Sequence, residues 1–175
     1  MENLPPKDWV LTGAKGRKSR IVRSLILDVE QMEEHNWKLY RKYQRIKKKE
    51  QRYEIFEMED AEIAVVAFGS CARIAKGAVK RARERGIKVG LIRLITLWPF
   101  PEEIIKKYSE TISDFIVFEM NTGQMVEDVK LVLEGKNNIV FYGRPGGVVP
   151  TPLEFFKVIR KVYKLNYEYK SSPDF

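Results

Sequence analysis

The residues best suited to binding chemistry lie in the run EMNTGQMVEDV, residues 119–129. Glu119, Asn121 and Gln124 supply a carboxylate and two amides there. They follow the apolar run DFIVF (114–118) and precede apolar residues at helical spacing, which predicts a corner between a strand and a helix. Ligands and partners dock at such corners in open α/β sheets, and a helix start has unpaired N–H groups. We expect binding here and no catalysis, because the corner holds no obvious nucleophile or general base.

A second predicted corner is GSCAR (69–73), which follows the apolar run 61–68. Its small residues and Arg73 allow either an anion site or a tight turn, and we favour the turn because P-loop and G-x-G-x-x-G patterns are missing. Cys71 lies at the helix start, where the pKa of a thiol can be lowered. No histidine lies in the predicted α/β domain that holds Cys71, so a catalytic cysteine is disfavoured. His35, the one histidine, has too few companions for a metal site and is interpreted as a surface or interface residue.

Two more loops follow predicted strands. TLWPFP (96–101) carries Trp98 and Phe100, which either anchor an interface or plug the end of a core, and we weigh these interpretations equally. RPGG (144–147) places Arg144 beside a flexible turn. There the guanidinium either binds a carboxylate or phosphate or borders a structural turn, and we favour the turn.

A long amphipathic helix is predicted over residues 28–53, from apolar residues that recur every seven positions: Leu25, Met32, Leu39, Ile46 and Tyr53. Asp28 is the expected N-cap, and the basic end at 47–49 suits the helix dipole. The apolar seam is narrow, so we expect it to lie across another domain or subunit. The basic stretch 41–52 also raises nucleic-acid binding, but acidic residues on the same segment favour a solvated face.

Strand and helix patterns alternate from about residue 60 onward. Strands are predicted at 61–68, 87–94, 114–120 and 138–143, and helices at 69–86, from about 102 to 109, at 123–134 and from Thr151 to about 165. This alternation predicts an α/β fold: an open, mostly parallel sheet of four to five strands with helices on both faces. We predict three regions: an arm and linker helix (1–54), the α/β domain (55–165) and a tail (166–175).

Charge and composition restrict the class of protein. The net charge of +8 is concentrated in residues 1–54, which hold 14 Lys and Arg against 8 Asp and Glu. No apolar run is long enough to span a membrane, and the N-terminus does not resemble a secretory signal. A single cysteine excludes an internal disulfide, so a cytoplasmic location is expected. The abundance of Lys, Glu, Arg and Ile hints at a thermophile.

Three segments together resemble a known family: TLWPFP (96–101), FEMNTGQMVEDV (118–129) and GRPGG (143–147). Their order and spacing are similar to those of the carboxyl-terminal part of the α subunit of 2-oxoacid:ferredoxin oxidoreductases, of the 2-oxoisovalerate (3-methyl-2-oxobutanoate) type. The segments DWVLTG (8–13) and 59–79 and the stretch 24–43 also resemble that subunit, so the resemblance covers roughly residues 8–165.

The resemblance implies a domain like the carboxyl-terminal domain of transketolase. It also implies a complex that decarboxylates a 2-oxoacid on thiamine diphosphate with Mg²⁺, passes electrons through iron–sulfur clusters to ferredoxin, and forms an acyl-CoA. The chain lacks the family's amino-terminal pyrimidine-binding half, a GDG…N motif and the cysteines of a cluster. We therefore expect no cofactor and no catalysis on this chain alone, and interpret it as a fragment or the product of a split gene.

The leading hypothesis is a structural domain that packs against the rest of the α subunit and against the β subunit. The γ and δ subunits, ferredoxin and CoA are expected as partners of the whole complex. Glu119, Asn121, Gly123 and Gln124 would form the contact, Trp98 and Phe100 would anchor it, and Arg144 would lie at its edge. A homo-oligomer is possible for the isolated chain. The alternative is a free-standing basic α/β module that binds nucleic acid or an anionic metabolite.

Overall fold

The computed structural model describes residues 6–7, 10, 13–21 and 24–165 of the 175-residue chain. The chain forms two compact units, Met1–Lys42 and Tyr43–Phe175. The predicted tail (166–175) lies outside the described residues.

Helix α1 spans Val29–Lys49, and none of its residues is buried. Asp28 caps it as predicted, because its Oδ1 accepts the backbone N–H of Gln31 at 2.9 Å. The predicted extension of this helix to residue 53 is wrong. Tyr53 instead begins strand β1. Pairing with β3 satisfies the backbone N–H and C=O groups that further helical turns would otherwise have bonded.

Five strands form one sheet in the order β1-β3-β2-β4-β5. Strand β1 pairs antiparallel with β3, and the other neighbours are parallel. The predicted mostly parallel α/β sheet is confirmed, with the unpredicted β1 at one edge. The strands are β1 (Tyr53–Phe56), β2 (Ile63–Phe68), β3 (Val89–Leu94), β4 (Asp114–Glu119) and β5 (Asn138–Gly143).

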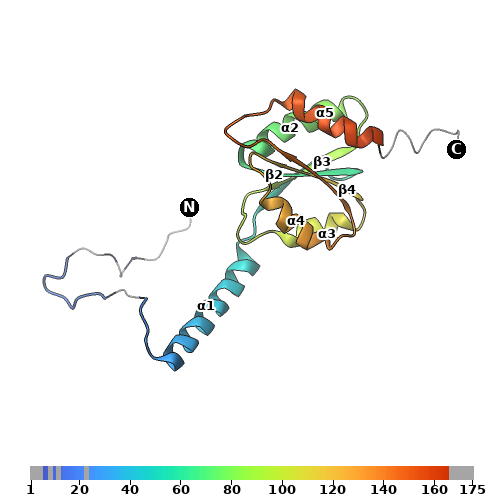
Figure 1. Ribbon diagram of the computed structural model, residues 1–175. Helices are drawn as coiled ribbons and strands as arrows, with labels where there is room; N and C mark the ends of the chain where they lie inside the picture. The colour runs from blue at the N-terminus through green and yellow to red at the C-terminus, as the bar shows by residue number, and fades with distance from the viewer. Residues whose placement is uncertain (1–5, 8–9, 11–12, 22–23, 166–175) are drawn as a thin grey trace. The chain divides into compact units, whose positions relative to one another are not determined.

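Four helices cover the two faces of the sheet, as predicted (Figure 1). One face carries α2 (Gly69–Arg83) and α5 (Pro152–Tyr163), and the other carries α3 (Glu102–Ser109) and α4 (Met125–Leu133). Helix α5 begins with a capping box, in which Thr151 and Glu154 each satisfy the other's backbone N–H.

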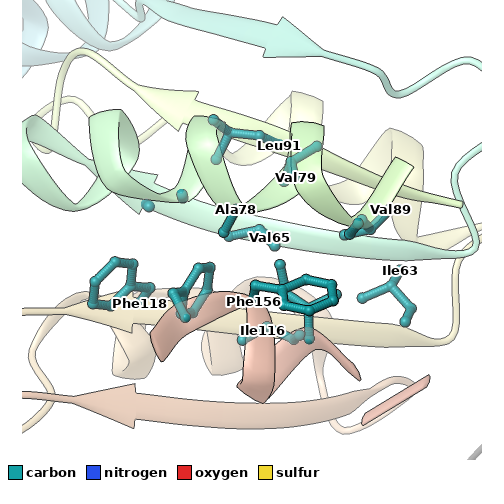
Figure 2. Packing of buried hydrophobic residues seen from close by; sticks show 14 of the residues in the cluster. Ile63, Val65, Ala78, Val79, Val89, Leu91, Ile116, Phe118 and Phe156 are labelled. Atoms are coloured by element: carbon teal, nitrogen blue, oxygen red, sulfur yellow. The ribbon is translucent and has the colours of Figure 1, made fainter. Parts of the chain in front are cut away.

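The sheet separates two apolar cores because alternate residues of a strand point to opposite faces. In β2, Ile63 and Val65 belong to the core under α2 and α5, which Figure 2 shows from close by, while Ala64 and Val66 belong to the core under α3 and α4. A strand buried on both faces needs a continuous apolar sequence, which is the pattern that β2 and β4 carry.

The strand order reverses between β2 and β4, since β3 lies on one side of β2 and β4 lies on the other. The β2–α2 and β4–α4 corners are therefore neighbours at the carboxyl edge of the sheet. The Cys71 thiol of the first corner interacts with the backbone of Met120 in the second. This reversal is where open α/β sheets bind their ligands.

Candidate functional site

The β4–α4 corner is organised by the carboxylate of Glu119, whose residue is 0% exposed. Its Oε2 accepts the backbone N–H groups of Gln124 at 3.3 Å and Met125 at 2.9 Å, and its Oε1 accepts that of Val126 at 3.0 Å. A negative charge at the start of a helix is stabilised by the helix dipole. Our expectation of unpaired N–H groups at the start of α4 is therefore wrong, because Glu119 occupies the place of a bound anion.

Asn121 holds the loop between the strand and the helix. Its Oδ1 accepts the backbone N–H of Gly123 at 2.8 Å, and its Nδ2 donates to Glu119 Oε2 at 3.0 Å and to Gln124 Oε1 at 3.4 Å. Gly123 has a φ of +106°, which side chains rarely adopt. The four residues that sequence reasoning grouped as a contact surface are bonded to one another, and these bonds enclose the carboxylate.

Arg144 lies against the same corner through its backbone, whose N–H donates to the Glu119 carbonyl oxygen at 3.1 Å. Its guanidinium donates to the Tyr142 hydroxyl at 3.3 Å and lies 3.6 Å from Glu154. The Tyr142 bond and the Glu154 charge raise the pKa of Arg144 above its usual value. These contacts support the interpretation of Arg144 as part of a structural turn.

The two aromatic residues of the 96–101 loop differ in burial. Phe100 is half-buried and packs on the core under α3 and α4, so it plugs the end of that core. Trp98 is 56% exposed and meets Tyr43 edge-on, with ring centroids 5.6 Å apart. Among the described residues, no hydrogen bond or ion pair joins either one to the Glu119 corner. Contact of the seven predicted site residues with a partner stays a prediction.

The β2–α2 corner has a different chemistry. Cys71 is buried, and burial followed by the charge of Glu119 raises the pKa of its thiol above its ordinary value, so the lowered pKa that a helix start allows does not occur here. Beside it, a cavity of about 430 Å³ lies between β1, β3 and the first two turns of α2. Sequence reasoning named the GSCAR corner with Arg73 here and favoured a tight turn over an anion site. The recurrence of Arg73, Lys76 and Lys80 at helical spacing was the available signal, but the strand β1 that closes the cavity was not foreseen.

Neither corner assembles a metal site. No group of three or more His, Cys, Asp or Glu side chains within the described ranges could hold a metal ion. The same part of the chain contains no helix long and apolar enough to cross a membrane. The fold and the site together define a class: an open-sheet α/β domain in which one corner at the carboxyl edge is filled by the domain's own carboxylate.

Comparison with known proteins identifies the family. The sequence profile of "Pyruvate:ferredoxin oxidoreductase core domain II" matches residues 61–155, and the chain belongs to this family. It is 40% identical over 165 residues to ketoisovalerate oxidoreductase subunit VorB of Methanothermobacter marburgensis, covering 94% of this chain and 46% of that protein. It thus spans about half the length of that relative.

More distant relatives agree with this assignment. The 2-oxoglutarate synthase subunit KorA of Methanocaldococcus jannaschii is 38% identical over 100 residues, 57% of this chain and 27% of that protein. The structure of 2-oxoglutarate:ferredoxin oxidoreductase from Magnetococcus marinus matches with a TM-score of 0.64 and 20% identity, over 78% of this chain and 24% of that one. The latter likeness shows the fold. The predicted homology to subunits of 2-oxoacid:ferredoxin oxidoreductases is confirmed.

Proposed function

We propose that this chain is the carboxyl-terminal domain of the α subunit of a thiamine-diphosphate-dependent 2-oxoacid:ferredoxin oxidoreductase and that it works within an assembled complex. The observation that carries the proposal is the 40% identity with VorB across 94% of the chain. The reaction of the complex converts a 2-oxoacid, CoA and oxidised ferredoxin into an acyl-CoA, CO₂ and reduced ferredoxin. The name of VorB favours ketoisovalerate (3-methyl-2-oxobutanoate) as the 2-oxoacid.

The domain's own residues do not fit the cofactors of that reaction. A four-thiolate iron–sulfur cluster needs more than the single cysteine of this chain, and Cys71 is buried in the apolar core. The described residues also bring together no set of three metal-ligating side chains for the Mg²⁺ of thiamine diphosphate. We therefore assign the cofactors to other parts of the complex and give this domain a structural and assembly role in a cytoplasmic enzyme.

The contact surface follows from what is exposed at the carboxyl edge. Glu119, Asn121 and Gly123 keep the β4–α4 corner in one shape, because their polar groups are bonded to one another. Gln124 is exposed beside them, and the exposed Trp98 is the largest apolar side chain of the 96–101 loop, which follows β3. A rigid polar corner and an exposed tryptophan at the same carboxyl edge of the sheet are suited to anchor a subunit interface.

Co-expression tests this proposal. The chain is produced with the amino-terminal half of such an α subunit and with the β subunit, and we expect the three to co-purify and the oxidation of 3-methyl-2-oxobutanoate to require this chain. Trp98→Ala should weaken co-purification, whereas Leu131→Ala, which also shortens an exposed apolar side chain, should not. Absence of co-purification, or full activity without this chain, would refute the proposal.

A further inference from the structure

The cavity at the β2–α2 corner, here called the basic pocket, collects positive charge. Arg73 and Lys76 from α2 and Arg93 from β3 line it, against one carboxylate, that of Glu54 in β1. Arg93 is paired with Glu54 at 2.9 Å. Within the described part of the chain, no ion pair occupies Arg73 or Lys76. The pocket therefore holds two cations that no described carboxylate neutralises.

The floor and walls of the pocket are apolar. Leu91 is buried, and Phe56 presents its ring beside α2, with the Lys76 ammonium 4.8 Å from the ring centroid. A volume of about 430 Å³ is within the range of small-molecule sites. Since the cations meet at one cavity and do not run across a surface, the pocket suits a small molecule better than a nucleic acid.

The start of α2 adds donors for an anion. Gly69 and Ser70 line the same pocket, and no side chain caps this helix. A Cβ added to Gly69 would meet nothing within 4 Å, so the space beside this glycine is open. Backbone N–H groups, a serine hydroxyl and an arginine are the donors that phosphate prefers at such sites.

We propose that the basic pocket binds a small phosphate-bearing molecule with a flat or apolar part. The phosphate lies between Ser70, Arg73 and the first N–H groups of α2. The apolar part lies against Phe56 and Leu91. The basic pocket does not depend on the proposed assembly role. All of its lining residues belong to this chain, and none of them belongs to the Glu119 corner.

Calorimetric titration of the full chain at one fixed salt concentration tests the proposal, with ATP, AMP, inorganic phosphate and adenosine as probes. We expect ATP or AMP to saturate one site per chain and adenosine to bind far more weakly. Arg73→Gln should weaken binding about tenfold or more, because it removes a charge-assisted hydrogen bond. Lys76→Gln, at a second exposed cation of the pocket, should also weaken it.

Arg81→Gln is the matched control, since Arg81 is an exposed arginine of the same helix that does not line the pocket. Its affinity should equal that of the unaltered chain. Three results would overturn the proposal: no saturable binding of any phosphate compound, equal binding of adenosine, or equal weakening by Arg73→Gln and Arg81→Gln. Because the titration uses this chain alone, its outcome is independent of the co-purification experiment.

Discussion

The β4–α4 and β2–α2 corners are neighbours at one edge of the sheet, yet opposite groups face their helix starts. Glu119 fills the first corner and accepts three backbone N–H groups of α4 and its cap. The second corner has no capping side chain and opens on Arg73 and Lys76. One strand-to-helix topology thus produces either a closed, internally bonded corner or an open basic one, and a single acidic residue at the strand end makes the difference.

The largest expected effect is that of Glu119→Gln. The amide keeps the shape but turns an NH₂ group toward buried N–H donors, which leaves at least one donor unpaired. We expect the free energy of unfolding, measured by urea titration, to fall by about 3 kcal/mol. Glu127→Gln, at an exposed acid in the first turn of α4, should change it little. Similar losses for both variants would mean that the closed corner does not stabilise the fold.

A smaller loss is expected for Asn121→Ala, because the loop loses its bonds to Gly123 and Glu119 while the carboxylate keeps its backbone donors. The free energy of unfolding should fall by about 1 kcal/mol. Thr122→Ala, at the exposed neighbouring position, is the control and should leave it unchanged. If both variants unfold at the same urea concentration, the side chain of Asn121 does not hold the loop.

The thiol of Cys71 should react slowly in the folded chain. Its pKa is raised by burial, so at neutral pH little thiolate forms, and alkylation by iodoacetamide should be about tenfold or more slower than in urea. The folded chain also holds this proton more tightly than the unfolded chain does. The free energy of unfolding should therefore fall as the pH rises above 9.0, and Cys71→Ala should remove that dependence. Rapid alkylation of the folded chain would contradict this account.

The smallest effect belongs to the open corner. Arg73→Gln should leave the urea midpoint unchanged, because none of the described residues forms an ion pair or hydrogen bond with its exposed guanidinium. Thermal unfolding followed by circular dichroism gives an independent check. A clear loss of stability would mean that the Arg73 side chain stabilises the fold. The two corners would then not differ in the way proposed.

Sequence patterns predicted most of the elements. Strands β2 and β4 are continuous apolar runs, and buried parallel strands require that pattern whatever surrounds them. The caps at Asp28 and Thr151 are local bonds within one turn, so they too could be predicted from residue type and position. The error came at Tyr53, where the seven-residue spacing of the helix continues by coincidence into the strand β1.

The role of Glu119 depended on the direction of its side chain, and the basic pocket depended on contacts between distant segments. The sequence identified Glu119 as a site residue. It did not show whether the carboxylate faces a partner or its own helix, because the sequence pattern is the same in both cases. The basic pocket needs Phe56 and Glu54 of β1 beside α2, and β1 is placed by its pairing with β3, about 40 residues away in the chain.

By itself, the sequence determined the family, the alternation of strands and helices, and the position of the corners, because each depends on local residue order. The tertiary structure alone decided that Glu119 closes one corner while the other stays open and basic. That difference depends on the direction in which the Glu119 side chain turns and on the pairing of β1 with β3, which encloses the pocket. Burial then determines the outcome, because a buried carboxylate must be paired inside the protein, whereas exposed cations can remain solvated until a ligand binds.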